Sequence, residues 1–250
     1  MKIGIIVQAR MGSTRLPGKI LKPFYNNLSI LDILLSTLHK IHGAKIIVAT
    51  SINEENYVLE QYLKDKGECV FRGSENDVLE RFIRAAEQYK VDRIIRICSD
   101  NPFIDFDGIQ RLVDVGTAAS CDYLGYSVNG KPSILTHFGF WGEYVTLKAL
   151  KRVYNETPID SPAHEHVTNY IYTHPDEYTC EWIDCPNDIT QRTDVRLTVD
   201  TDSDFKNAQT VYADLVQKNK SFTISDIIAY LDAHKEIKSS MQSNINKNTK

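Results

Sequence analysis

The sequence predicts an α/β protein of three layers, with helices on both faces of a mostly parallel β-sheet. Short β-branched runs alternate with helix-like segments through the first half of the chain, and this alternation is typical of right-handed strand–helix–strand units. The length of 250 residues suits one large α/β domain, because a chain of this size buries enough surface to fold without disulfides or metal ions.

The elements of the first half are expected in strict alternation. β-Branched and apolar runs predict buried parallel strands, which cover residues 2–8, 44–50, 69–71 and 93–98. Apolar side chains at helical spacing predict helices, which cover residues 30–41, 53–66, 74–89 and 107–119. The carboxyl ends of these strands are therefore expected along one edge of the sheet, where open parallel sheets bind their ligands.

The pattern changes from about residue 121. Residues 121–144 are rich in glycine and aromatic side chains, which predicts extended chain, loops or short antiparallel strands. Later helices are expected at 145–155, 164–174, 202–218 and 225–234, and later strands at 178–185 and 195–199. Residues 239–250 have almost no apolar side chains, which predicts a disordered tail. We expect one domain over residues 1–238, with a smaller aromatic-rich insertion at about 121–190.

The composition argues against several classes of function. Lys and Arg number 29 and Asp and Glu number 33, which gives a net charge of −4, so neither a nucleic-acid partner nor a polybasic membrane contact is expected. The longest apolar runs are far too short to span a bilayer, and the N-terminus lacks the features of a signal peptide. Five sparse cysteines suit free thiols in a reducing compartment. We expect a cytoplasmic protein.

The segment 7–19, VQARMGSTRLPGK, follows the first predicted strand directly. Its glycines allow the backbone to approach phosphate groups, and its two arginines and one lysine offset their charge. The loop is neither a Walker A motif, since five residues separate Gly12 from Gly18, nor the G-x-G-x-x-G dinucleotide fingerprint. It predicts a polyphosphate site, and the alternative interpretation is a solvated turn with incidental charges.

This loop resembles the opening signature of the cytidylyltransferases that activate acidic sugars, namely the 3-deoxy-manno-octulosonate and acylneuraminate enzymes and the SpsF-like branch. The matching residues are Ala9, Arg10, Ser13, Arg15, Leu16, Pro17, Gly18 and Lys19. The resemblance implies a nucleotide-diphospho-sugar transferase fold, which is Rossmann-like, and a CTP-dependent transfer assisted by Mg²⁺. Further similar blocks begin at residues 71, 98, 165 and 196, so the likeness covers about residues 3–205.

The resemblance also implies which residues carry the chemistry. The nucleotide would be held by Ala9, Arg10, Met11, Gly12, Ser13, Arg15, Lys19, Arg72, Ser74 and Asp77. Arg15, Lys19 and Asp100 are expected to be catalytic. Asp100 follows a strand in a metal-binding Asp-x-Pro pattern, and Asp200 ends another β-like run. Both are expected as Mg²⁺ ligands, and the alternative for each is a turn or helix-cap aspartate.

The acceptor is less clearly indicated. Residues 136–144, THFGFWGEY, depart from the Pro-Asp-Gly-hydrophobic-Asp-x-Glu block usual in the family, and this segment is expected to shape the acceptor pocket. The resemblance places Glu165 and His166 near the acceptor, and Glu143, which lies in this segment, is expected there as well. A zinc site at His164-Glu165-His166 is not favoured, because residues two apart do not share a helix face. The aromatic side chains between residues 123 and 144 would stack a sugar, form a dimer contact or pack the core.

Taken together, these features predict a Mg²⁺-dependent cytidylyltransferase. It would transfer CMP from CTP to a sugar acid or similar small-molecule acceptor and release pyrophosphate, for surface glycan synthesis. One alternative keeps the fold but uses a phosphorylated metabolite or sugar phosphate as acceptor, with CTP or GTP. Another is a glycosyltransferase with a nucleotide-sugar donor, and a third is a non-catalytic nucleotide-binding protein. A homodimer is expected, because related enzymes commonly form one.

Overall fold

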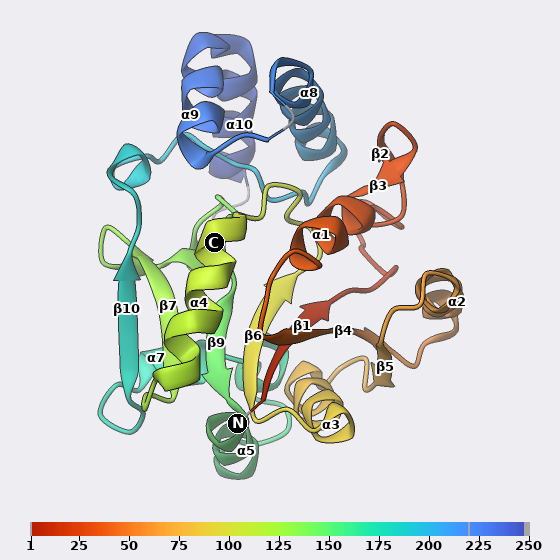
Figure 1. The fold of residues 1–250 in the computed structure, drawn as a ribbon, viewed down its shortest axis with the longest axis vertical. Helices are drawn as coiled ribbons and strands as arrows, with labels where there is room; N and C mark the ends of the chain where they lie inside the picture. The colour runs from red at the N-terminus through yellow and green to blue at the C-terminus, as the bar shows by residue number, and fades with distance from the viewer. Residues whose placement is uncertain (1, 220, 248–250) are drawn as a thin grey trace.

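A central sheet of eight strands, with helices on both faces, organises the molecule (Figure 1). The computed structural model describes residues 2–219 and 221–247. The parallel half of the sheet has the order β6-β1-β4-β5. Its strands are β1 (Ile3–Gln8), β4 (Ala44–Ser51), β5 (Val70–Gly73) and β6 (Arg93–Cys98). The four strands predicted in the first half of the chain are confirmed, and their carboxyl ends lie along one edge.

The aromatic-rich part extends the same sheet beyond β6, in the order β9-β7-β10. Its strands are β7 (Tyr123–Val128), β8 (Lys131–Pro132), β9 (Glu143–Thr146) and β10 (Cys180–Asp184). β9 runs antiparallel to both of its neighbours, β8 pairs antiparallel with β7, and β10 is parallel to β7. The sheet is therefore mostly parallel, and β9 joins the aromatic-rich part directly to β6.

Two hydrophobic cores lie on opposite faces of the sheet, because successive side chains of a strand point to opposite faces. In β1, Ile5 and Val7 belong to one core and Ile6 belongs to the other. The first core is covered by α1 (Ile30–Leu38), α2 (Tyr57–Asp65), α4 (Phe106–Ala118), α8 (Asp202–Lys218), α9 (Ile224–Ala233) and α10 (Lys235–Lys247). The second is covered by α3 (Val78–Tyr89), α5 (Leu147–Glu156), α6 (Pro162–His166) and α7 (Asn169–Thr173). The three-layer α/β prediction is confirmed.

Short elements connect these layers. They are the hairpin strands β2 (Pro23–Tyr25) and β3 (Leu28–Ser29) and the 3₁₀ turns η1 (Glu54–Asn56), η2 (Ser133–Leu135) and η3 (Asn187–Ile189). The helix expected over 164–174 is two helices, because Val167 adopts a φ of 53° between α6 and α7. No described helix is long and apolar enough to cross a bilayer.

The start of α1 shows how local sequence stabilises an element. Ser29 and Asp32 form a capping box, in which each side chain accepts a hydrogen bond from the other residue's backbone N–H. Asp32 also accepts a hydrogen bond from the Tyr62 hydroxyl at 2.7 Å and lies 2.9 Å from Lys66 Nζ. Burial alone would raise the pKa of Asp32, but the hydrogen bonds from Tyr62 and Ser29 outweigh it and lower the pKa to about 2.

The strand predicted at 195–199 is wrong, since these residues pair with loops and not with a strand. The N–H groups of Leu197 and Thr198 donate to the His137 carbonyl at 2.8 and 3.2 Å, and the Val199 N–H donates to the Asp100 carbonyl at 3.0 Å. The segment therefore crosses the carboxyl ends of the strands. This crossing brings Asp200 beside Asp100.

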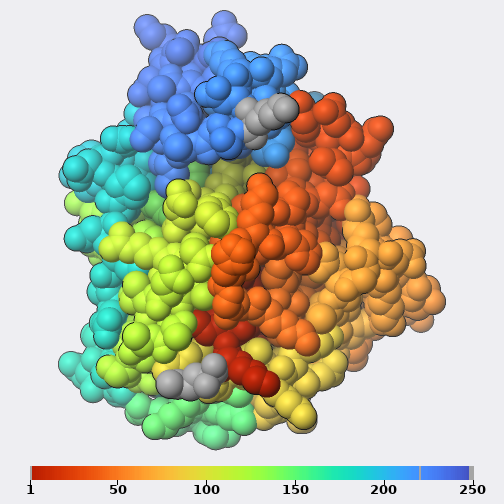
Figure 2. All heavy atoms as spheres, in the orientation of Figure 1, coloured from red at the N-terminus to blue at the C-terminus, as the bar shows by residue number. Residues whose placement is uncertain are grey.

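The prediction of a disordered tail is also corrected, because residues 239–247 form most of α10. Met241 is only 1% exposed, and the Asn244 amide donates to the Asp204 carboxylate at 2.9 Å. The C-terminal helices, blue in Figure 2, pack on the body of the molecule. One buried apolar side chain and one buried amide thus anchor a segment of low hydropathy. Residues 248–250, which the prediction also covered, lie outside the described residues.

Candidate functional site

A cleft of about 220 Å³ opens at the carboxyl ends of β1 and β6. We call it the main cleft. It is lined by Gln8, Arg10, Gly12, Ser13, Thr14, Arg15, Lys19, Ile20, Cys98, Ser99, Asp100 and Asp200. The parallel pairing of β1 with β6 sets Gln8 level with Cys98, so the loop after each strand enters the same cleft. Five of the predicted nucleotide-binding residues and both predicted metal ligands are brought together here.

The loop of residues 9–19 is folded back on itself by backbone hydrogen bonds. The N–H groups of Ser13 and Gly18 both donate to the Met11 carbonyl, at 2.9 and 3.1 Å. Gly18 has a φ of 67°, which glycine adopts without the strain of a side chain. Gly12 lies against the end of the exposed Glu55 side chain, which would have to move to admit a Cβ at position 12. The loop thus has one compact form that presents its cationic side chains to the cleft.

Lys19 lies at the bottom of the main cleft and is 8% exposed. Its Nζ lies 3.0 Å from Asp100 Oδ2, 2.5 Å from the Val199 carbonyl oxygen and 3.5 Å from Asp200 Oδ1. Two carboxylates from distant segments therefore flank one ammonium group. This pairing compensates the charges in a site where an isolated charge would be costly to bury.

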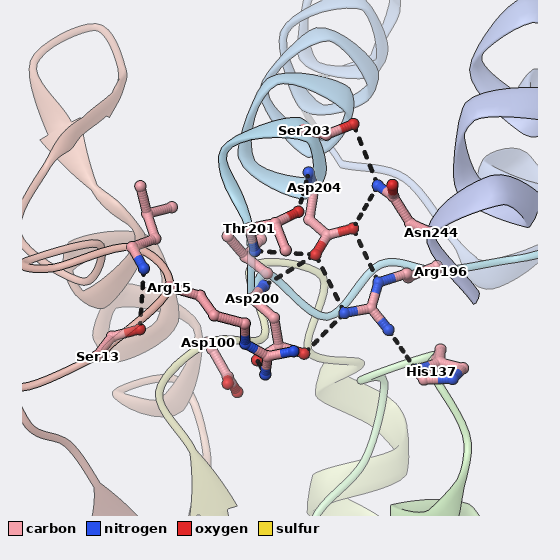
Figure 3. Close-up of polar contacts among 12 residues, drawn as sticks. Ser13, Arg15, Asp100, His137, Arg196, Asp200, Thr201, Ser203, Asp204 and Asn244 are labelled. Atoms are coloured by element: carbon pink, nitrogen blue, oxygen red, sulfur yellow. Dashed lines mark hydrogen bonds and ion pairs between the residues drawn. The ribbon is translucent and has the colours of Figure 1, made fainter. Parts of the chain in front are cut away.

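Asp200 is held by two arginines as well (Figure 3). Arg15 Nη2 approaches Asp200 Oδ1 at 3.3 Å from the open side of the cleft, and its side chain is 51% exposed. Arg196 Nη2 donates to Asp200 Oδ2 at 2.8 Å from the buried side. Arg15 is therefore the more exposed of the two cations, while Arg196 fixes the orientation of the carboxylate.

Arg196 is itself held in place by the first turn of α8 (Figure 3). It donates to both oxygens of Asp204, at 2.8 and 3.1 Å, and to His137 Nδ1 at 2.7 Å. Asp204 is also the acidic member of the capping box of α8. Burial alone would raise the pKa of Asp204, but the hydrogen bond and charge of Arg196 outweigh it and lower the pKa. Asp204 therefore stays ionised as a partner for Arg196.

The other predicted loop residues occupy distinct positions. Ala9 is buried, and its N–H donates to the Ala49 carbonyl at 3.1 Å. The Met11 side chain packs against the first core. Ala9 and Met11 therefore present backbone groups, and not side chains, on the loop surface. Arg10 Nη1 lies 3.1 Å from Glu75 Oε1. This ion pair connects the main cleft with the loop that follows β5.

The structure does not bring Arg72 or Asp77 to the main cleft. The Arg72 guanidinium donates to the carbonyls of Ser51 and Ile52 and to the Glu60 carboxylate, at 3.1, 2.8 and 2.8 Å. Asp77 caps α3, and its Oδ2 lies 2.8 Å from His164 Nδ1. Both side chains are engaged by protein groups, so they shape the end of β5 and the start of α3.

Ser74 lines a second hollow, of about 440 Å³, beyond the Arg10–Glu75 ion pair. We call it the side pocket, and its lining residues are Ile52, Asn53, Gly73, Ser74, Glu75, Asn76, Glu80, Arg81 and Arg84. Arg81 is fully buried, and only its Nη1 makes a hydrogen bond, to the Ser74 carbonyl at 2.8 Å. Its Nε and Nη2 find no partner among the described residues. Burial lowers the pKa of Arg81, and the nearby Glu75 opposes that effect.

Two residues had no predicted role in the site, namely Arg81, which ends the family-like block that starts at residue 71, and Asn56. Arg81 has a sequence signal, because it lies three residues after the buried Val78 on the inner face of α3. Asn56 has none. It is fully buried, accepts a hydrogen bond from the Met11 N–H at 2.8 Å and donates to Ser51 Oγ at 2.7 Å. It ties the loop of residues 9–19 to the end of β4.

The three residues expected near the acceptor do not line the main cleft, and their role toward an acceptor stays a prediction. Glu143 is 1% exposed and pairs with Arg96 at 2.6 Å in the second core, where it accepts a hydrogen bond from the Tyr123 hydroxyl at 2.8 Å. It is not among the residues that line the main cleft. Glu165 and His166 are exposed on α6, which packs against α3. Their place in the fold follows from packing of the second core, which the local sequence pattern does not reveal.

Two of the cysteines and the aromatic side chains of residues 123–144 have structural partners. The described residues contain no group of three or more His, Cys, Asp or Glu side chains that would hold a metal ion. The Sγ atoms of Cys180 and Cys185 contact Ile171 O and Thr190 Oγ1. The aromatic side chains expected to stack a sugar or to pack a core or dimer contact are all buried within the chain, and they are Tyr123, Tyr126, Phe138, Phe140, Trp141 and Tyr144.

Comparison with known proteins agrees with this geometry. The cytidylyltransferase family profile matches residues 4–238. The spore coat polysaccharide biosynthesis protein SpsF of Bacillus subtilis (strain 168) is 35% identical over 212 residues, covering 83% of this chain and 85% of SpsF. The structure of a cytidylyltransferase from Leptospira borgpetersenii is 28% identical, with a TM-score of 0.79 over 95% of this chain and 96% of that chain. The structure of CMP:2-keto-3-deoxy-manno-octonic acid synthetase complexed with CTP is 13% identical, with a TM-score of 0.63 over 87% of this chain and 100% of that chain.

The fold is therefore that of the nucleotide-diphospho-sugar transferases, and the protein is a nucleotidyltransferase. More particularly, the chain belongs to the cytidylyltransferase family, and its relation to SpsF agrees with the branch that its loop resembles. The predicted fold, class of enzyme and family are confirmed.

Proposed function

We propose that this protein transfers CMP from CTP to a sugar acid or a similar small acceptor, releases pyrophosphate, and serves surface glycan synthesis. The observation that carries the proposal is Lys19, whose ammonium group lies between Asp100 and Asp200 under a cation-bearing glycine loop. Two relatives support the substrates. One is named for spore coat polysaccharide biosynthesis, and the other is a CMP-sugar-acid synthetase with CTP bound.

The triphosphate of CTP fits the main cleft by its charge. Arg10, Arg15 and Lys19 all line the cleft, and each is paired with a carboxylate in the structure. An incoming triphosphate competes for these cations, because charge-assisted contacts to phosphate oxygens are strong. Exposed Arg15 exchanges partners most easily. The loop glycines allow backbone N–H groups to approach the phosphates.

Mg²⁺ fits the pair of carboxylates that Lys19 now separates. Magnesium is commonly held by one or two carboxylates together with substrate phosphates and water, and Asp100 and Asp200 face one point at the bottom of the cleft. When bound, the ion would offset charge on the phosphates. Arg196 holds Asp200 in orientation from behind, so this carboxylate needs little rearrangement to serve as a ligand.

The transfer itself needs positioning and charge stabilisation more than covalent chemistry. An oxygen of the acceptor attacks the α-phosphorus in line, the bond from that phosphorus to the β-phosphate oxygen breaks, and pyrophosphate leaves. Arg15 and Lys19 stabilise the charge that moves onto the leaving group. A carboxylate or phosphate acceptor needs no general base. An acceptor hydroxyl would pass its proton to solvent or to a group supplied with the substrate.

The side pocket suits the cytosine base. It adjoins the main cleft through the Arg10–Glu75 ion pair, and it offers N–H groups on Arg81 and an oxygen on Glu75 that have no partner within residues 2–219 and 221–247. Cytosine presents hydrogen-bond acceptors beside an amino donor, so both kinds of group have a use. Ser74, predicted to contact the nucleotide, lines this pocket.

CTP is a cytoplasmic metabolite, and we expect the enzyme in that compartment, as a homodimer.

The proposal is tested with nucleotides first, because they do not require a known acceptor. Thermal unfolding is measured with CTP, GTP, UTP, ATP and nucleotide-sugars, each with and without Mg²⁺. A ligand at 100 times its Kd adds about 2.7 kcal/mol, which raises the Tm of a chain this long by roughly 5–10 °C. A shift specific to CTP with Mg²⁺ supports the proposal. A shift with GTP alone or a nucleotide-sugar alone contradicts it.

Pyrophosphate release with a panel of sugar acids and sugar phosphates then assigns the acceptor. Asp100→Asn is expected to lower turnover by about 100-fold or more, because a metal-binding carboxylate is lost. Asp65→Asn, at an exposed position of α2, is the matched control and is expected to retain full activity. Full activity of Asp100→Asn would remove Asp100 from the transfer site.

A further inference from the structure

A small cavity of about 80 Å³ adjoins the main cleft and shares Cys98 and Asp100 with it. We call it the aromatic pocket. Its lining residues are Cys98, Asp100, Asn101, Ser133, Ile134, Thr136, Phe138, Gly139, Phe140, Trp141 and Thr198. Five of these eleven residues come from the 136–144 segment, where the chain departs from the block usual in its family. The Asp100 carboxylate marks the boundary between the pocket and the cleft.

Two buried oxygens of this pocket have no hydrogen-bond partner in the described part of the chain, Asn101 Oδ1 and Thr198 Oγ1. Both belong to the segments that carry the candidate metal ligands, since Asn101 follows Asp100 and Thr198 precedes Asp200 by two positions. An unsatisfied buried polar atom is costly, so a ligand hydroxyl or amide that donates to these oxygens gains affinity. The two atoms make the pocket polar at one end.

The rest of the pocket is a fixed aromatic wall. Trp141 stacks on Tyr126 with ring centroids 4.4 Å apart and planes 13° apart, and its Nε1 donates to Asp105 Oδ2 at 3.3 Å. Phe138 and Phe140 are stacked at 5.8 Å. These contacts leave the rings little freedom, so the pocket is organised before a ligand arrives. Aromatic faces suit the C–H groups of a sugar-like chain.

The charge of the pocket selects against acidic groups. None of its lining residues is Lys, Arg or His, and its one ionisable carboxylate is Asp100. A carboxylate or phosphate placed here would be desolvated beside Asp100, and no cation lines the pocket, because Lys19 pairs with Asp100 from the side of the main cleft. The cations of the site lie on the other side of Asp100, in the main cleft. An acidic acceptor must therefore keep its acid group in the cleft.

Size limits what else can enter. The aromatic pocket, at about 80 Å³, is much smaller than the main cleft of about 220 Å³, so it takes a short group and not a whole nucleotide. Gly139 preserves this space at the polar end. A Cβ at position 139 would lie 2.6 Å from Asn101 Oδ1 and 3.1 Å from Thr198 Cγ2, and the φ of 67° disfavours a side chain as well. A larger residue here would fill the pocket.

We propose that the aromatic pocket binds a short, neutral, hydroxyl-bearing part of the acceptor, and that Asn101 and Thr198 recognise it. The proposal deepens the proposed function and rests on it for the identity of the ligand as an acceptor. It divides the acceptor between two environments. The neutral end is buried against the aromatic wall, and the acidic end faces the arginines and the lysine of the main cleft.

Trp141 allows a direct binding test, because the chain has only two tryptophans. The other, Trp182, is 42% exposed on the edge strand β10, and Trp182→Phe leaves Trp141 as the sole reporter. In this background we would titrate glycerol as a neutral probe and malonate as a probe of equal chain length with an acid group at both ends, at matched ionic strength. Glycerol is expected to change Trp141 emission saturably, and malonate, which has no neutral end to place in the pocket, is expected to bind there at least about tenfold more weakly.

Variants separate specific binding from a solvent effect. Thr198→Val keeps the shape of the side chain and removes the hydroxyl, so it is expected to weaken glycerol binding about fivefold. Asn101→Leu is expected to act in the same direction, and circular dichroism shows whether each variant is folded. Thr117→Val, at an exposed position of α4, is the matched control and is expected to leave the titration unchanged.

Three results would overturn the proposal. They are a lack of any saturable Trp141 response to glycerol up to about 0.5 M, a Trp141 response to malonate as strong as that to glycerol, and unchanged binding in folded Thr198→Val. The thermal shift with CTP is measured on the same proteins. A missing CTP shift with an intact glycerol response contradicts the proposed function and leaves the pocket's chemistry standing. A normal CTP shift without a glycerol response contradicts the pocket alone.

Discussion

Lys19 and Asp100, 81 positions apart in the sequence, form an ion pair of 3.0 Å between Nζ and Oδ2 at the bottom of the main cleft. The pair joins the loop after β1 to the loop after β6, and Asp200 adds a second carboxylate from the segment before α8. In the structure the ammonium group occupies the position between two carboxylates where we propose a magnesium ion. Replacement of the Lys19 ammonium group by Mg²⁺ at this position can therefore be measured.

Lys19→Ala is expected to make stability depend on Mg²⁺. Without the ammonium group, Asp100 and Asp200 face each other with less compensation, which costs about 2 kcal/mol of unfolding free energy and lowers the Tm by roughly 4–8 °C. Millimolar Mg²⁺ is expected to restore most of this loss and to stabilise the variant more than the native protein. Scanning calorimetry with and without the ion measures both effects. Lys22→Ala, which removes an exposed pair with Asp202, is the control, and an equal Mg²⁺ response in all three proteins would refute the exchange.

Asn56→Ala is expected to weaken nucleotide use without unfolding the protein. The substitution removes the acceptor for the Met11 N–H and the donor to Ser51 Oγ, so the loop of residues 9–19 loses its tie to β4. Because transfer depends on positioned groups, kcat/KM for CTP should fall roughly tenfold. Asn56→Asp retains an acceptor for Met11 and should lose less. Steady-state kinetics on both variants checks the order, with exposed Asn155→Ala as control, and equal losses in Asn56→Ala and Asn56→Asp would count against a positioning role.

Asp32→Asn is expected to destabilise the protein at neutral pH and to lose that effect in acid. The folded-state pKa of Asp32 is lowered to about 2, so its contribution is fully present above the ordinary value near 4 and is lost as pH falls toward 2. The difference of nearly two pKa units corresponds to about 2 kcal/mol at pH 7. Urea unfolding at pH 7, 5 and 3 measures the difference between native and variant protein. A difference that grows toward pH 3 would be inconsistent with the sign of this shift.

Asn244→Ala is expected to change both stability and the Mg²⁺ requirement, because Asn244 links the C-terminal helix α10 to the site. Asn244 donates to Asp204 at 2.9 Å and to Ser203 Oγ at 3.1 Å, and Asp204 holds Arg196 behind Asp200. Loss of the amide should cost about 1 kcal/mol of unfolding free energy and raise the Mg²⁺ concentration needed for half-maximal activity. Asn246→Ala, at an exposed position of the same helix, should change neither quantity. An unaltered Mg²⁺ requirement in Asn244→Ala would confine α10 to a purely structural role.

Several features followed directly from local sequence patterns. The strand that precedes the loop of residues 9–19 is a continuous apolar run, and Asp100 comes directly after another such run. Parallel strands present their carboxyl ends at one edge, so meeting of Lys19 and Asp100 in one cleft was predictable. The loop signature then indicated the family, because it specifies many positions within a short segment.

Tertiary structure alone decided which charged side chains are buried as partners and which face the cleft. Glu143 and Arg72 are of residue types common in active sites, yet both pair with other protein groups. Asn56 and Arg81 had no predicted role, yet Asn56 holds the loop of residues 9–19 and Arg81 lines the side pocket. The physical reason is range. Strand and helix periodicity and the position of a residue after a strand are local properties, but burial, ion pairing and a helix anchored by one amide depend on contacts between segments far apart in the chain.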